Sequence, residues 1–327
     1  MKKKSNLRSV GSARSAFTII ELLVAVAVTA LMVSLMLTIV VNVLNGWNRS
    51  SGTLSSGNQA RTVMDLITSD LQSAILRRDG NVWLVATIQD SAPSEWTGST
   101  KPVGAASSAT DTAGGSRYTP AVASPLPSIE DYRFGQGGVW LRMFTTVPDT
   151  NATIATISAP RAVSYKIVRQ KVASSGTESR YMLYRSELAP NTTFTTGYDL
   201  FGSSYYAGVI KTPVQSSLVA NNVVDFGVRF LKSNSTNQLV PIFPTTNSAV
   251  CFAATSDSAK SGSGVDSTPT RDFPTVADIF IRVLTDEGAT KLANLESGVS
   301  TAETWWEIVL ANSRVYSRRV EIKANGL

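Results

Sequence analysis

An uncharged apolar run near the N-terminus restricts this chain more than any other feature of its sequence. The run extends for twenty residues from Leu22 to Val41, contains only three hydroxyl side chains, and is followed by no proline until Pro93. As an α-helix it would be about 30 Å long, which matches the hydrocarbon thickness of a bilayer. The sequence therefore predicts a membrane-spanning helix over residues 17–44.

The residues that flank this run indicate its orientation and its type. Basic residues and no acid lie before Phe17, so the leader over residues 1–16 would stay in the cytoplasm and the rest would be exported. A secretory signal peptide would have a shorter apolar stretch and a small-residue cleavage site, which residues 42–47 do not offer. A plain membrane anchor would fit the length. It would not explain Glu21, an acid inside the apolar edge where charge is costly.

Residues 15–24 read SAFTIIELLV, and this segment resembles the prepilin signature of type IV pilins and type II secretion pseudopilins. The resemblance implies that a prepilin peptidase cuts between Ala16 and Phe17 and methylates the new amino group of Phe17. Most members of the family have glycine before the cut, where this chain has Ala16. The resemblance also makes Glu21 the fifth mature residue. Its carboxylate would pair with the terminal ammonium group of a neighbouring subunit, so that two charges that are costly in lipid satisfy each other.

A second helix is predicted just after the membrane segment. Residues 45–58 are polar and contain glycine, which indicates a hinge. Apolar residues then recur at steps of three and four from Ala60 to Ala74, which predicts an amphipathic helix over about 56–78. We expect this helix to place its apolar stripe on a sheet. The hinge and the helix together make up residues 45–80.

Residues 81–327 are predicted to form a β-rich head. Eight segments read as strands, and in several of them polar and apolar residues alternate at every second position. These segments are residues 82–88, 138–147, 162–170, 181–186, 223–231, 249–253, 276–284 and 315–322. Short helices are expected at 286–295 and 301–311, and long loops at 91–128 and 254–275. The predicted fold class is α+β and pilin-like: a long N-terminal transmembrane helix, then an amphipathic helix packed on an antiparallel β-sheet head.

The order of motifs beyond the membrane segment is similar to that of the minor pseudopilin J family of type II secretion. The helix motif ARTVMDL, the strand motif YMLYR and the late strand ending in RVL follow one another in that order. The long loops resemble those of the Verru_Chthon cassette proteins, pilin-like proteins of Verrucomicrobia, and of member C in particular. These resemblances imply a single-pass protein of the bacterial inner membrane with its head in the periplasm. The implied partners are other pilin-like subunits, the prepilin peptidase and the inner membrane.

The residue content excludes several classes of chemistry. The chain has no histidine, which rules out histidine bases and histidine-ligated metals, and its single cysteine, Cys251, cannot form an intrachain disulfide. Apolar neighbours predict that this thiol is buried and inert. The net charge of +6 falls to +1 without the leader, so no nucleic-acid partner is expected. The acid pairs Glu130–Asp131 and Asp286–Glu287 are typical of turns or helix N-termini, and we predict no catalytic residue, no metal and no cofactor.

Three hypotheses for function follow from these patterns. The first is a minor pilin-like subunit of a type II secretion pseudopilus or a type IV pilus, and not an enzyme. The alternative is a bitopic envelope protein whose β-rich domain binds a glycan or a protein. The third is an anchored hydrolase that uses carboxylates. The identity of the mature N-terminus separates the first hypothesis from the second, and turnover of a substrate by the head would support the third.

Overall fold

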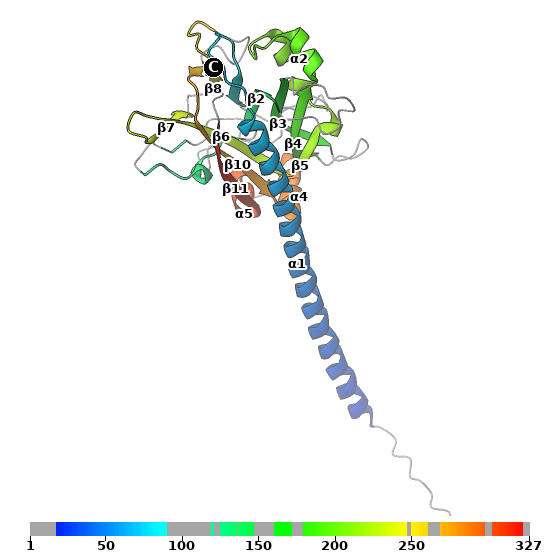
Figure 1. Cartoon of the computed structure of the whole chain (residues 1–327). Helices are drawn as coiled ribbons and strands as arrows, with labels where there is room; N and C mark the ends of the chain where they lie inside the picture. The colour runs from blue at the N-terminus through cyan, green and yellow to red at the C-terminus, as the bar shows by residue number, and fades with distance from the viewer. Residues whose placement is uncertain are drawn as a thin grey trace, which may run out of the picture. The chain divides into compact units, whose positions relative to one another are not determined.

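The part of the chain that the structure describes forms a mixed α+β fold with an apolar N-terminal helix and two sheets, which confirms the α+β part of the predicted class (Figure 1). The computed structural model describes residues 18–89, 119–120, 125–135, 137–146, 160–171, 179–246, 250–260, 269–297 and 303–322. The chain divides into two units, Met1–Ser51 and Gly52–Leu327. The predicted leader with Ala16 and Phe17, and most of the predicted loop 91–128, lie outside the described residues.

Helix α1 spans Ile19–Gln72 and belongs to both units. The tract 45–58, which we expected to form a hinge, is helical throughout. Its glycines do not break the helix because a single glycine costs only about 1 kcal/mol in a helix interior and no proline is present. The boundary between the two units, after Ser51, falls within this tract.

The second part of α1 carries the predicted apolar stripe, and the structure confirms it. Val63, Ile67 and Leu71 are fully buried in the core of the second unit. The helix ends at Gln72 rather than near residue 78, because the backbone that follows pairs with the sheet: Ile75 N–H donates to the Phe144 carbonyl at 2.9 Å.

The larger sheet has seven strands in the order β5-β4-β3-β2-β1-β8-β9. All neighbours are antiparallel except β8 and β9, which are parallel. Its strands are β1 Leu84–Ile88, β2 Val139–Thr145, β3 Arg161–Lys171, β4 Ser179–Leu188, β5 Leu218–Asn221, β8 Cys251–Ala254 and β9 Thr270–Arg271. Strands β3 and β4 form a long antiparallel pair, from Ala162 opposite Leu188 to Lys171 opposite Ser179.

The smaller sheet has four strands in the order β11-β10-β6-β7, and all of its pairs are antiparallel. Its strands are β6 Val223–Ser233, β7 Leu239–Phe243, β10 Val276–Leu284 and β11 Ser313–Glu321. Each predicted strand in the two sheets has its counterpart, whereas β5, β7 and β9 were not predicted. Strand β7 contains Pro241, which weakens a strand pattern and is tolerated here because β7 lies at the sheet edge.

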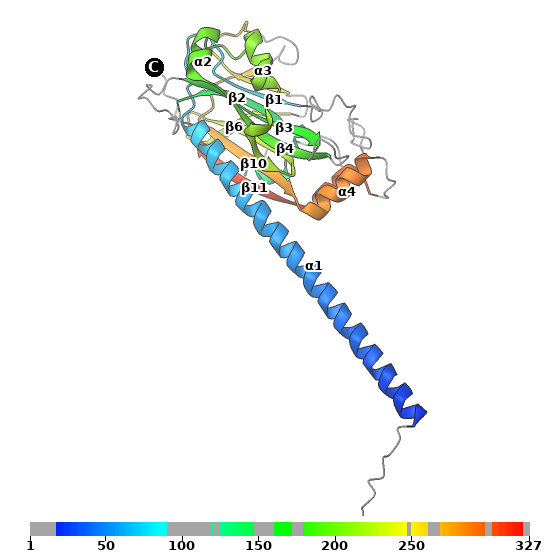
Figure 2. The ribbon, with the colours of Figure 1, turned by 90° about the vertical axis from the view of Figure 1, so that its right-hand side faces the viewer.

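Short helices complete the second unit (Figure 2). They are α2 Pro190–Thr196, α3 Gly208–Lys211, α4 Asp286–Glu296 and α5 Trp305–Asn312, with the 3-10 helices η1 Ile129–Asp131, η2 Ser203–Tyr206 and η3 Gln215–Ser217. Both helices expected near the C-terminus are present as α4 and α5. The side chain of Thr285 caps α4, and Thr304 and Glu307 form a capping box on α5. Trp305 and Trp306 are buried in the core.

Candidate membrane and assembly site

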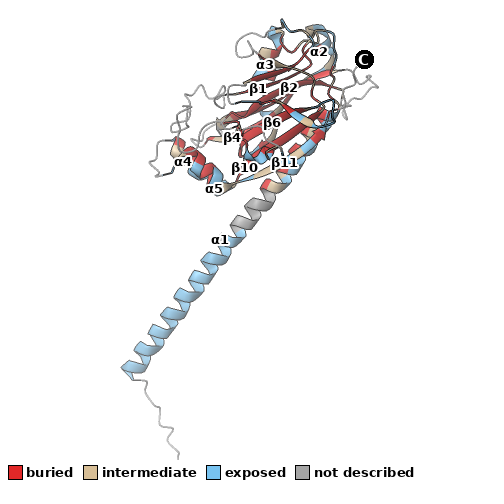
Figure 3. Cartoon of the chain, turned by 90° about the vertical axis from the view of Figure 1, so that its left-hand side faces the viewer, coloured by how far each residue is buried: buried red, intermediate tan, exposed pale blue. Residues whose placement is uncertain are grey.

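The first part of α1 presents apolar side chains that nothing else in the described chain covers. Residues Ile19–Leu44 form a stretch of 26 residues with a mean hydropathy of 2.7, and none of it is buried (Figure 3). Apolar surface of this extent is costly in water and needs a lipid or protein environment. The segment is long and apolar enough to cross a membrane, which confirms the length and composition of the predicted span.

Glu21 lies in the first turn of α1 and caps the helix together with Thr18. The Thr18 backbone N–H and its hydroxyl group both donate to Glu21 Oε2, at 3.0 and 3.1 Å. In return, the Glu21 N–H donates to Thr18 Oγ1 at 3.3 Å. This reciprocal arrangement is a capping box. Our sequence analysis missed this local role, although the spacing of Thr18 and Glu21 is its ordinary sequence signal.

The local cap occupies only part of the Glu21 carboxylate. Both contacts from Thr18 go to Oε2, and within the described part of the chain Oε1 accepts no hydrogen bond. The carboxylate therefore has one oxygen engaged in the helix and one that a further donor can reach. Ala16 and Phe17, the other two residues of the predicted processing site, lie outside the described residues.

A buried ion pair fixes the last turn of α1 to the larger sheet. The carboxylate of Asp70 is 0% exposed and accepts two hydrogen bonds from Arg185 on β4, from Nε at 2.8 Å and from Nη2 at 3.1 Å. The hydroxyl of Tyr165 on β3 donates to the same carboxylate. Burial alone would lower the pKa of the Arg185 guanidinium, but the Asp70 carboxylate raises it well above its usual range. A bidentate pair of this kind specifies both the position and the rotation of the helix.

A second buried carboxylate locks the register of the smaller sheet. Asp278 on β10 lies directly opposite Arg229 on β6 and Arg319 on β11. Arg229 Nε donates to Oδ2 at 3.1 Å, and Arg319 Nε donates to Oδ1 at 2.6 Å. Burial would raise the pKa of Asp278, but the hydrogen bonds from Arg319 and Arg229 outweigh it and hold the pKa below its usual range. A one-residue slip of either neighbouring strand would break the contact of its own arginine with Asp278.

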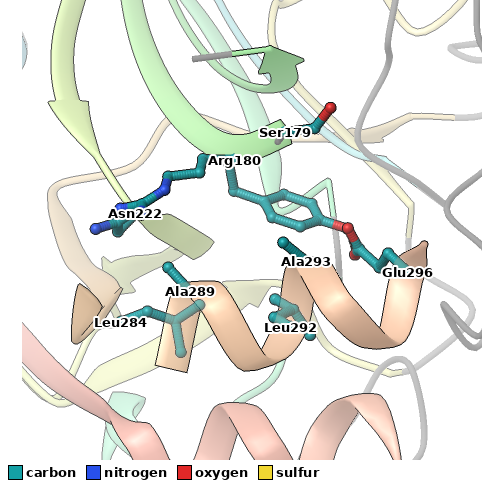
Figure 4. A pocket seen from close by; sticks show the side chains of 9 residues that line it. Ser179, Arg180, Asn222, Leu284, Ala289, Leu292, Ala293 and Glu296 are labelled. Carbon is teal, nitrogen blue, oxygen red and sulfur yellow. Dashed lines mark hydrogen bonds between the residues drawn. The ribbon is translucent and has the colours of Figure 1, made fainter. Parts of the chain in front are cut away.

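Glu296, in the last turn of α4, is the third buried carboxylate, and Figure 4 shows it beside a small cavity. It accepts hydrogen bonds from the Tyr181 hydroxyl at 2.5 Å, from Arg169 Nε at 2.7 Å and from Trp305 Nε1 at 3.0 Å. The cavity is about 10 Å³, which is the space of roughly one water molecule. Both oxygens of the Glu296 carboxylate are thus engaged by protein donors, and the cavity has no room for a substrate. The role of this carboxylate is to hold α4 and α5 on the sheet.

The other residues singled out in the sequence lie where their patterns indicated. Glu130 and Asp131 lie in the first turn of η1, and Asp286 lies at the start of α4. Cys251 is buried on β8, and burial raises the pKa of its thiol to about 11. Among the residues that the structure describes, no group of three or more acidic, histidine or cysteine side chains could hold a metal ion.

No protein-family model, no curated protein and no solved structure matches this chain. The functional argument therefore depends on the N-terminal signature and on the geometry of the chain itself.

Proposed function

We propose that this chain is a minor pilin-like subunit of a type II secretion pseudopilus or a type IV pilus. In this proposal the prepilin peptidase cuts between Ala16 and Phe17, and Phe17 becomes the methylated N-terminus. The helix over 17–44 then holds the subunit in the inner membrane with its head in the periplasm, and later enters a filament. The observation that carries the proposal is Glu21: a carboxylate within the signature segment, at the start of a fully exposed apolar stretch of helix.

The exposed surface of α1 is compatible with both environments that the proposal requires. Residues Ile19–Leu44 expose apolar side chains on all sides, so they fit a lipid bilayer, and they equally fit a bundle of identical helices. Glu21 keeps Oε1 outside the capping box, so an ammonium group of a neighbouring subunit can bind it without opening the first turn. Pairing with that ammonium would offset the cost of placing the carboxylate in an apolar surrounding.

Mass spectrometry of the mature N-terminus tests the processing step. The chain is expressed with its own prepilin peptidase and purified from membranes. We expect a first residue of N-methyl-Phe17 and complete loss of residues 1–16. Ala16→Gly, which restores the residue usual in the family, should be cut at the same bond at least as fast. An intact leader, or a mature chain that begins elsewhere, contradicts the proposal.

Two substitutions separate a role in assembly from the local helix cap. Glu21→Gln keeps the capping box, since glutamine serves at that position, but removes the charge. Thr18→Val removes the hydroxyl of the cap and keeps the charge. We expect Glu21→Gln to reduce incorporation into sheared filaments by about tenfold or more, while Thr18→Val assembles normally. Both variants should resist carbonate extraction from membranes like the parent chain. Normal assembly of Glu21→Gln would leave helix capping as the whole role of this residue.

A further inference from the structure

A polar cavity of about 420 Å³ lies in the second unit, and none of the three buried carboxylates described above lines it. It is bounded by η1, by strand β10 and by helix α5. The residues that line it are Pro120, Glu130, Asp131, Arg133, Arg282 and Leu310. Its volume lies within the range of sites that bind small molecules.

The interior wall of this cavity carries a buried arginine that is not satisfied by the protein. Arg282 on β10 is only 6% exposed, and its Nε is buried without a hydrogen-bond partner. Within the described ranges of the chain no hydrogen bond or ion pair engages its guanidinium. Burial lowers the pKa of Arg282. A buried cation in this condition is costly, and an anion bound beside it would remove much of that cost.

The nearest acid supplies only part of the missing negative charge. Asp225 on β6 lies opposite Arg282 in the sheet register, but its Oδ2 accepts from the Phe134 N–H at 3.3 Å, and its Oδ1 accepts no hydrogen bond from any residue that the structure describes. Burial raises the pKa of Asp225 to about 7, against the opposing effect of Arg282 and Arg133, so near neutral pH it is ionised only in part. The half-buried Arg133 guanidinium, which lies over the Trp306 ring at 5.6 Å, adds a second positive charge.

The mouth of the cavity has the opposite charge. Glu130 and Asp131 are both exposed, and Glu130 accepts a hydrogen bond from the Ser317 hydroxyl at 2.7 Å. These two carboxylates would repel a doubly charged anion such as phosphate. They would attract an ammonium group. The exposed side chain of Leu310 supplies an apolar part of the lining.

We propose that this cavity binds a small zwitterion of the α-amino-acid class. Its carboxylate lies against the guanidinium of Arg282, with Arg133 nearby, and its ammonium group lies toward Glu130 and Asp131. The proposal is independent of filament assembly: it concerns a different part of the chain, and either can fail without the other.

Isothermal titration of the full-length chain in detergent micelles tests this site. The probes are glycine, L-leucine, L-glutamate and L-lysine, with acetate, methylamine and inorganic phosphate as fragments and competitors. We expect saturable binding of at least one amino acid, weaker binding of acetate and none of phosphate. Binding of phosphate in preference to the amino acids, or no saturable binding of any amino acid, overturns the proposal.

Substitutions of the lining residues then test where the amino acid binds. Arg282→Gln should weaken amino-acid binding about tenfold to a hundredfold, as expected for a lost hydrogen bond to a charged group. Arg314→Gln removes an exposed arginine of β11 and is the matched control, with no expected effect. The double variant Glu130→Gln, Asp131→Asn changes only exposed side chains at the cavity and leaves the core intact. It therefore tests amino-acid binding at this site even if Arg282→Gln folds poorly. This double variant should weaken amino-acid binding and leave acetate binding unchanged. If Arg282→Gln and Arg314→Gln have equal effects on amino-acid affinity, the proposed site is wrong.

Discussion

Replacing Asp225 with asparagine should flatten the pH dependence of this chain's stability between pH 5.5 and 8.0. Asp225 is fully buried, and burial raises its pKa from the usual 3.8 to about 7. Arg282 and Arg133 face it and lower the pKa, but they do not outweigh burial. Between about pH 4 and pH 7 the carboxyl group of Asp225 therefore keeps its proton in the folded chain, whereas in the unfolded chain it has already lost it.

The sign and size of the effect follow from the two pKa values. The raised pKa stabilises the folded chain at low pH, and this contribution is lost as the pH rises from about 4 to about 7. Each pH unit in that range corresponds to about 1.4 kcal/mol. From pH 5.5 to 8.0 the free energy of unfolding of the parent chain should therefore fall by about 2 kcal/mol through Asp225 alone. Asp278, whose pKa is lowered, titrates below this window.

Urea unfolding of the full chain in detergent micelles measures this difference. Fluorescence of the buried tryptophans, among them Trp305 and Trp306, reports the unfolding of the head. The free energy of unfolding is extrapolated to zero urea at several pH values for the parent chain and for Asp225→Asn. In Asp225→Asn the free energy of unfolding should lack this fall of about 2 kcal/mol between pH 5.5 and 8.0, whatever the absolute stability of the variant is. The comparison uses the slope of the free energy of unfolding against pH, so a constant cost of placing the asparagine amide beside Arg282 does not affect it.

Asp65→Asn is the matched control for this experiment, because it removes an exposed carboxylate from α1. It should keep the pH slope of the parent chain. The reasoning is refuted if Asp225→Asn and the parent chain lose stability in parallel over the whole window. That parallel course would mean that Asp225 is already ionised in the folded chain throughout the window.

Three further predictions test the buried interior. Asp70→Ala leaves the Arg185 guanidinium buried without its carboxylate and should lower the free energy of unfolding in urea by about 3–5 kcal/mol; a loss below about 1 kcal/mol would show that the pair is solvated. Gly227→Ala places a Cβ against the Phe280 ring, where there is no room for it, and should lower stability by about 1–3 kcal/mol in thermal unfolding; an unchanged melting temperature would contradict this packing. Cys251, with its thiol pKa raised to about 11 by burial, should resist maleimide at pH 8 until urea unfolds the chain; rapid labelling of the folded chain would show an accessible thiol.

Features that depend on local sequence were largely predictable. Residues 22–41 must form a helix in lipid because no other structure satisfies their backbone groups, and an uninterrupted apolar run is enough to indicate it. The stripe from Ala60 to Leu71 and the alternation in β6 and β10 are periodic, so they identify a helix and two strands without knowledge of their partners.

Elements with weak local patterns were decided by tertiary contacts. Strands β5 and β9 are four and two residues long, too short for a periodic signal, and exist because neighbouring strands offer hydrogen bonds. The tract 45–58 has the composition of a loop but continues the helix on both of its sides. The strand orders of the two sheets are likewise properties of the assembled head.

The sequence by itself determined that this chain has an apolar helix able to span a membrane, a charged signature at its start and a β-rich remainder. Only the tertiary structure decided which charges are buried. Asp70, Asp278 and Glu296 form ion pairs with arginines from other strands, whereas among the described residues no carboxylate forms an ion pair with Arg282. The physical reason is that the cost of burying a charge depends on the groups around it in space, and residues far apart in the sequence supply those groups.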